Sequence, residues 1–162
     1  MKRGTLATSF VALTFLMVGC SSSKSASTPT TAADGGGGGV TIPAADGAPL
    51  SVQATDQSAT AQSFVFDKTS IAAGKVTITF ENKGNRQHEL ILLKTDTAAD
   101  ALVIDKTTNK VSEDASVGEI SETDAGKTVV KTFDLKPGKY VFVCNIEKHY
   151  GQGMKQAFTV TG

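Results

Sequence analysis

The chain has 162 residues, and its 16 basic and 16 acidic side chains give a formal net charge of zero at pH 7. This length fits one modest domain, and the balanced charge without a basic block excludes nucleic acid as a predicted partner. The N-terminus differs from the rest, because Lys2 and Arg3 precede an apolar stretch from Leu6 to Val18. As a helix this stretch rises about 20 Å, short of the ~30 Å hydrocarbon core, so it predicts a secretory signal rather than a membrane span.

The run LMVGC, residues 16–20, ends this stretch and places a small glycine before Cys20. It resembles the lipobox of bacterial lipoproteins, in which the signal is removed and the cysteine becomes the acylated N-terminus. The resemblance implies a signal peptide over residues 1–19 and lipidation of Cys20. It also implies an extracytoplasmic protein, anchored by lipid to a bacterial or archaeal cell membrane. An ordinary signal peptide with a chance cysteine is the alternative.

Residues 20–49 are rich in Ser, Thr, Gly, Ala and Pro. Such a segment cannot bury enough apolar surface to offset its chain entropy, so it predicts a disordered linker. Its coil dimension is roughly 30 Å, which suits a spacer between a membrane surface and a folded domain over residues 50–162. An N-terminal extension with no length requirement is the other interpretation.

Residues 50–162 have the pattern of β-structure. The segment KVTITFE, residues 75–81, alternates apolar residues with threonines, as a half-buried strand does. Residues 139–144 are apolar on both faces, which predicts a central or covered strand. Turn residues separate the segments, including Pro137-Gly138. The other predicted strands are 63–67, 88–94, 128–134 and 155–161.

A long and mostly polar insertion occupies residues 95–127. Residues 97–105 are compatible with a short helix capped by Asp96 or Thr97, and residues 117–120 with a further strand. About seven short strands, turn-rich connections and little helix predict an all-β fold. We expect an antiparallel sandwich or a Greek-key barrel.

The predicted domain holds one cysteine, two histidines and one methionine. Cys144 ends one predicted strand and Met154 precedes the next, so the residues between them form a loop at one end of the fold. His149 lies midway in this loop. His88 begins another strand after a turn, so it can lie at the same end. We therefore predict that these four side chains meet.

A thiolate, two imidazoles and a thioether form a mixed soft and borderline ligand set. A trigonal His₂Cys site with a long axial Met is the arrangement of blue-copper electron-transfer centres. Structural zinc sites use Cys and His without methionine, so Met154 argues against zinc. A Cys144–His149 nucleophile would lack a third orienting residue and would leave Met154 unexplained. No enzymatic activity is therefore predicted.

Several motifs resemble the cupredoxins, the small blue copper proteins. They are His88 after ENKGNRQ, the strand LKPGKYVFVC, the Cys-x4-His-x4-Met loop and the closing strand KQAFTV, within roughly residues 55–162. The loop spacing is most similar to that of the sulfocyanin-like subgroup. The resemblance implies one type 1 copper per chain, with an axial methionine and the ligands His88, Cys144, His149 and Met154.

The chain departs from the family pattern at two places. Glu147-Lys148 stands where family loops often carry Pro-Gly, and Glu89 follows the first histidine where many members have asparagine. Hydrogen bonds around the ligands tune a metal centre, so these positions bear on the reduction potential.

The predicted function is a membrane-tethered one-electron carrier outside the cytoplasm. It would act as a monomer and dock transiently with redox partner proteins. Copper storage, or delivery to another exported protein, is the alternative. Copper chaperones tend to use several methionines or paired cysteines on accessible surfaces, whereas this chain offers one fixed set, which favours the carrier.

Overall fold

The computed structural model describes residues 47–146 and 148–162, and these residues form nine strands without a helix. Accordingly, this part of the chain contains no helix able to cross a membrane. The predicted signal peptide over 1–19, Cys20 and nearly all of the linker predicted over 20–49 lie outside the described residues.

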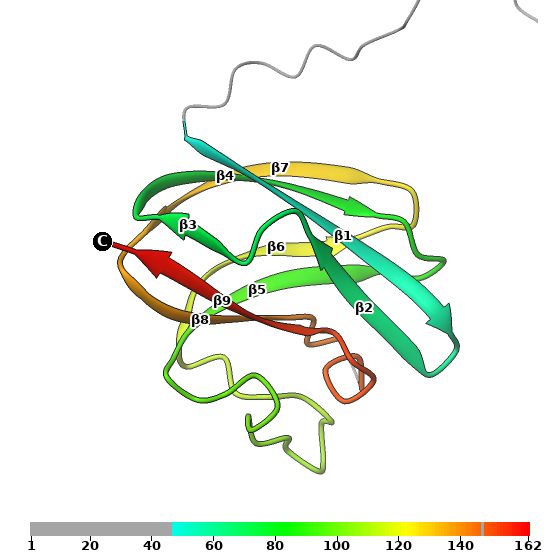
Figure 1. Ribbon diagram of the computed structural model, residues 1–162. Coiled ribbons are helices and arrows are strands. Elements are labelled where there is room, and N and C mark those ends of the chain that lie inside the picture. Colours follow the sequence, from blue (N-terminus) through cyan, green and yellow to red (C-terminus); the bar gives the residue numbers. More distant parts are fainter. Residues whose placement is uncertain (1–46, 147) are drawn as a thin grey trace, which may run out of the picture. The chain divides into compact units, whose positions relative to one another are not determined.

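The strands form two sheets that lie face to face (Figure 1). The four-stranded sheet has the order β2-β1-β4-β7, with bounds Ala61–Phe66, Ala48–Ser58, Gly74–Asn82 and Thr128–Leu135. The five-stranded sheet has the order β3-β9-β8-β5-β6, with bounds Ser70–Ala72, Lys155–Thr161, Gly138–Val143, His88–Lys94 and Ser116–Thr123. The predicted all-β sandwich is confirmed.

The sequence pattern predicts antiparallel sheets, but both sheets are mixed. Strand β1 lies parallel to β4, and β3 lies parallel to β9, whereas the other pairs are antiparallel. Parallel neighbours need a crossover connection. Between β1 and β4 the chain supplies it by way of β2 and β3, the second of which pairs in the opposite sheet.

Two strands escape the sequence pattern. In β1 the buried residues Leu50, Val52 and Ala54 alternate with more exposed polar ones, and the strand begins at Ala48, two residues before the expected domain start. Strand β3 has only three residues. The six other predicted strands are present, and the possible strand at 117–120 is the centre of β6.

The short helix suggested for residues 97–105 is wrong. This segment consists of turns and extended chain, and Ile104 forms an isolated bridge with Val111. Ala99 and Leu102 pack instead against an apolar cluster on the outer face of the five-stranded sheet. Residues 97–105 cover this apolar face, which favours an extended chain along the sheet over a helix.

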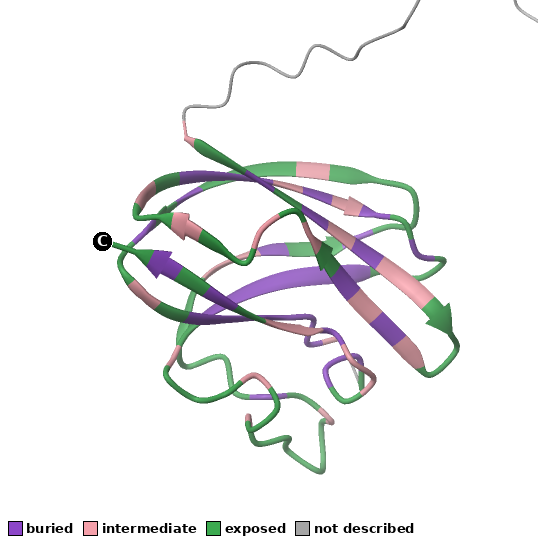
Figure 2. Ribbon diagram, in the orientation of Figure 1, coloured by how far each residue is buried: buried purple, intermediate pink, exposed green. Residues whose placement is uncertain are grey.

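The main core lies between the sheets, and its large side chains come from both of them. They include Val52, Ile78 and Phe80 from the first sheet and Leu92, Phe142 and Phe158 from the second. A second cluster on the outer face contains Ile91, Leu93, Val141 and Val143. Strand β5 is therefore buried along nearly its whole length, as Figure 2 shows. Residues 140–144 are covered as predicted, whereas Lys139 is exposed.

Candidate metal centre

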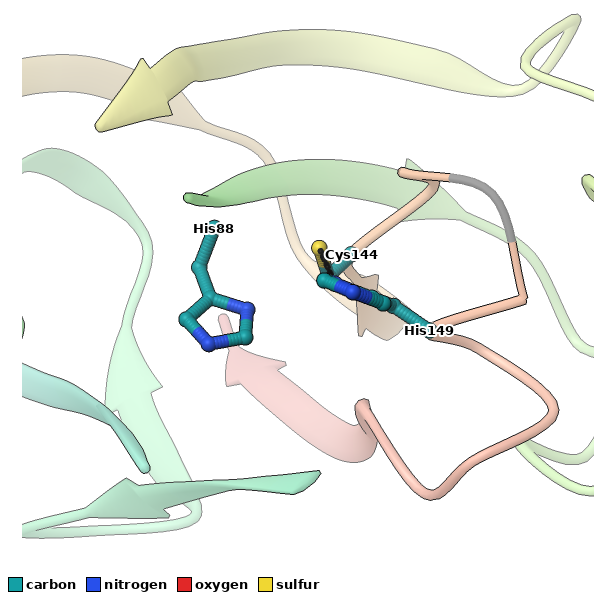
Figure 3. Close-up of side chains that lie close together, drawn as sticks. All are labelled: His88, Cys144 and His149. Atoms are coloured by element: carbon teal, nitrogen blue, oxygen red, sulfur yellow. Dashed lines mark hydrogen bonds between the residues drawn. The ribbon is translucent and has the colours of Figure 1, made fainter. Parts of the chain in front are cut away.

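Three of the predicted ligands meet at one end of the sandwich. His88 is the first residue of β5, Cys144 follows β8 directly, and His149 lies in the loop before β9. Their ligand atoms all lie within 4.8 Å of one another, and all three residues are buried (Figure 3). The Cys144 Sγ is 3.4 Å from His149 Nδ1. The ring centroids of His88 and His149 are 5.0 Å apart.

Backbone hydrogen bonds close the loop that carries two of these ligands. The ladder between β8 and β9 continues for one more step, because the Cys144 N–H donates to the Met154 carbonyl (3.1 Å). The Met154 N–H donates in turn to the His149 carbonyl (3.0 Å), and the His149 N–H to the Ile146 carbonyl (2.9 Å). These bonds fix the loop from within, so the positions of Cys144 and His149 follow from the hairpin itself.

The His88 ring presents a bare nitrogen to this cluster. Its Nε2 lies 2.9 Å from Asp56 Oδ1, whereas its buried Nδ1 has no hydrogen-bond partner among the described residues. Buried polar atoms are almost always paired, and each exception needs an explanation. A cation held by the three side chains would supply the missing partner.

The protonation states of the site suit a metal. Burial lowers the pKa of His88, although the neighbouring Asp56 partly opposes this, and burial also lowers the pKa of His149. Both rings are therefore neutral at pH 7 and offer a lone pair. Burial raises the pKa of the Cys144 thiol to about 12 in the metal-free protein. A bound cation reverses this, because a coordinating thiol is deprotonated outright.

A family model described as copper binding proteins of the plastocyanin/azurin family matches residues 51–161. The chain belongs to this family. Its buried cluster of two histidines and one cysteine fits one type 1 copper site. The resemblance to the cupredoxins and the predicted cofactor are thus confirmed.

Solved structures of auracyanins and of rusticyanin share the fold of this cupredoxin. A reduced auracyanin from the photosynthetic bacterium Roseiflexus castenholzii is 23% identical, with a TM-score of 0.51 over 72% of this chain and 100% of its own. Auracyanin B is 25% identical, with a TM-score of 0.50 over 77% and 97%. Reduced rusticyanin is 20% identical, with a TM-score of 0.51 over 72% and 81%. A comparison with curated proteins gives no match.

The fourth predicted ligand, Met154, is fully buried and lies directly before β9. It belongs to the same apolar cluster as Cys144 and is tied to the loop by its backbone. A buried thioether on the hairpin strand next to Cys144 suits an axial ligand. Its role as that ligand stays a prediction.

Glu89, which follows the first histidine of this cupredoxin, has a defined contact. The Glu89 carboxylate accepts a hydrogen bond from the Asn145 N–H (2.8 Å), directly after the copper-site cysteine. Burial raises the pKa of Glu89, and the nearby Glu122 and Glu113 add to this shift.

Two further polar residues of the site were not predicted from the sequence. They are Asp56, which contacts His88, and Asn145, which follows Cys144. Neither carries a local motif, since their partners lie 32 and 34 residues away.

The insertion at residues 95–127 forms hydrogen bonds with the loop that carries Cys144 and His149. The Asn145 side chain accepts from the Val111 N–H (2.8 Å) and donates to the Val111 carbonyl (2.9 Å) and to Glu113 Oε1 (2.7 Å). Further along, the Tyr150 hydroxyl donates to the Ala99 carbonyl (2.6 Å). The insertion therefore covers the outer sheet face and braces the two flanks of the metal loop.

This brace can be tested by changing Tyr150 to phenylalanine. We expect a loss of about 0.5–1.5 kcal/mol in the free energy of unfolding, because the Ala99 carbonyl loses its buried donor. Tyr140→Phe is the matched control, since the Tyr140 hydroxyl donates to the Lys136 carbonyl (2.8 Å) at the other end of β8. Denaturant titration should give similar losses for both variants. Only Tyr150→Phe should speed the release of copper to a chelator, and equal release rates would contradict the brace.

Proposed function

We propose that this cupredoxin is a one-electron carrier whose copper would be held by His88, Cys144, His149 and, more weakly, Met154. The observation that carries the proposal is the buried cluster of His88, Cys144 and His149, whose ligand atoms lie within 4.8 Å of one another. Bound copper supplies the one-electron couple. The axial position is assigned to Met154.

The chain itself keeps the site from changing shape. Cys144 and Met154 sit on adjacent positions of the β8–β9 hairpin, and His88 begins a strand that is buried on both faces. A closely packed protein interior resists rearrangement. The same arrangement of the ligands would therefore serve both oxidation states of the copper. Such a site exchanges electrons with little reorganisation, whereas release of copper to an acceptor would require the loop to open.

His149 is the suggested route for electrons. It is 5% exposed, whereas His88 and Cys144 are completely buried. A redox partner that docks on the loop would meet the edge of His149 first, and such interfaces are small and dissociate quickly. The buried ligand set leaves no position for a substrate, and we assign the protein no enzymatic activity of its own.

The electron-carrier function is tested by loading the full chain with Cu(II). One copper per chain, an intense blue colour and reversible bleaching on reduction would support it. Colourless Cu(I) that passes to an acceptor protein would instead support copper delivery.

The axial assignment is tested with Met154→Leu. We expect the variant to keep its blue colour and to change its reduction potential, because a long axial bond contributes little to holding the ion but tunes its electronics. Cyclic voltammetry and the visible spectrum provide the measurement. Loss of all copper binding in a folded variant would contradict an axial role.

We also propose that the protein is held at the outer face of a membrane through a lipid on Cys20. The support is the run LMVGC, residues 16–20, and the low-complexity segment that separates it from β1. Cell fractionation tests this proposal, since Cys20→Ser should move the protein from the membrane fraction to the soluble fraction. An unchanged distribution would contradict the lipid anchor.

A further inference from the structure

Asp56 contacts a copper ligand from the opposite sheet. It lies near the end of β1, and its side chain is only 7% exposed. One carboxylate oxygen, Oδ1, lies 2.9 Å from His88 Nε2. The other, Oδ2, accepts a hydrogen bond from the Asn85 N–H (2.6 Å). Both oxygens are therefore engaged, one by the ligand ring and one by the turn that leads to it.

The backbone around this contact leaves little freedom. The register of β1 against β2 shifts between Asp56 and Ser58, which marks an irregularity at this position. On the other side, a Cβ added at Gly84 would lie 2.7 Å from Asp56 Oδ2 and 2.9 Å from His88 Nε2. Real Cβ atoms essentially never approach so closely. The absence of a side chain at Gly84 therefore leaves the space in which the carboxylate and the ring meet.

This contact determines which ring nitrogen of His88 is free. Asp56 Oδ2 accepts from the Asn85 N–H, and Oδ1 faces His88 Nε2, so both carboxylate oxygens act as acceptors. An ionised carboxylate only accepts hydrogen bonds, so the neutral ring must carry its proton on Nε2. Its lone pair is then on Nδ1, the buried atom without a partner among the described residues. Figure 3 shows a ring nitrogen of His88 on the side that faces Cys144 and His149.

We propose that Asp56 is the positioning residue of the copper centre: it holds His88 as the Nε2–H tautomer and places a negative charge behind this ligand. The inference rests on the proposed function, because it concerns the same site. A carboxylate behind a metal-bound histidine orients the ring and raises its basicity. The added negative charge favours Cu(II) over Cu(I), so Asp56 lowers the reduction potential of this cupredoxin.

A purely structural role would have Asp56 only tie the turn through Asn85. Asp56→Asn separates the two roles, because an amide has the size of the carboxylate but only one acceptor oxygen. If this oxygen stays on the Asn85 N–H, the amide NH₂ faces His88 Nε2 and drives the ring proton to Nδ1. If it faces His88 instead, the turn loses its hydrogen bond and the charge is still gone.

The first experiment needs no metal. In the metal-free full chain, ¹⁵N NMR of the histidine rings should show His88 protonated at Nε2. In Asp56→Asn the ring should populate the Nδ1–H form, and Asp56→Glu should restore Nε2–H at least in part. A wild-type His88 protonated at Nδ1, or as an even mixture, would overturn the proposal.

The second experiment measures the reduction potential of the copper-loaded chains. Asp67→Asn is the matched control: Asp67 Oδ1 also accepts a backbone hydrogen bond, from the Ser51 N–H (2.9 Å), near the other end of β1. We expect Asp56→Asn to favour Cu(I) about tenfold more than the control does, a rise of about 59 mV for one electron. Equal potentials would overturn the electrostatic role. Failure of the wild type to bind copper would sink the proposed function, while the tautomer measurement would still decide the role of Asp56.

Discussion

Replacing Cys144 with serine is expected to abolish the blue colour of the copper-loaded protein and to leave the sandwich folded. The hydroxyl is a hard donor that stays protonated, so it cannot replace the soft thiolate of a blue-copper site. The side chain keeps nearly the same size, and its hydroxyl can bond the His149 ring, which lies 3.4 Å from the sulfur. We therefore expect the free energy of unfolding of the metal-free protein to change by about 1 kcal/mol.

Visible absorption measures the loss of the blue colour, and circular dichroism measures whether the variant is folded. Cys20→Ser is the matched control, because it removes the other cysteine of the chain and should leave the colour intact. An unchanged blue band in Cys144→Ser would show that the sulfur ligand has been misassigned. An unfolded variant would show instead that Cys144 is needed mainly for packing.

The second large effect is expected for Gly153→Ala. Gly153 precedes Met154, has a positive φ of 119° and leaves no space for a side chain. A Cβ there would lie 2.6 Å from the backbone oxygen of Gln62 in β2. The loop is tied to this strand, since the Gln62 N–H donates to the Gln152 carbonyl (3.1 Å). The alanine must push the metal loop away from β2, so both stability and copper affinity should fall.

Gly74→Ala is the matched control for backbone strain. Gly74 has a φ of 121°, and an added Cβ there has no neighbour within 4 Å among the described residues. The unfavourable φ should lower the free energy of unfolding of both variants by about 1–3 kcal/mol. Overpacking against β2 should lower that of Gly153→Ala by about 1–3 kcal/mol more. Denaturant titration and copper titration check this difference. Equal losses of stability, with equal copper affinities, would contradict the close docking of the loop on β2.

Much of the metal centre could be predicted because its signals are local. Cys144 and His149 share one hairpin loop, and the apolar run of β8 fixes where that loop begins. His88 lies at the start of a strongly apolar strand, so its place at one end of the fold followed from the strand boundary. These inferences depend on alternation and turn residues within a few positions, which a single sequence records well.

The other features depend on partners far away in the chain. Asp56 looks like any polar residue near a strand end, and only the packing of the two sheets, one with β1 and the other with β5, brings it to His88. Residues 97–105 have a helix-capping pattern, but Ala99 and Leu102 pack on the apolar outer face of β5 and β8. This packing keeps the segment extended. Tertiary packing overrides local preference there, as it does for the parallel pairing of β1 with β4.

Strand β1 joins two distant points of the domain. It begins at Ala48, one residue after the described chain begins, and the eighth residue after Ala48, Asp56, contacts His88 of the metal centre. At about 3.3 Å per residue these points are about 26 Å apart. The point where the chain enters the domain and the metal centre therefore lie at opposite ends of one strand. Anything attached to the N-terminal end of β1 would leave the metal loop accessible at the far end.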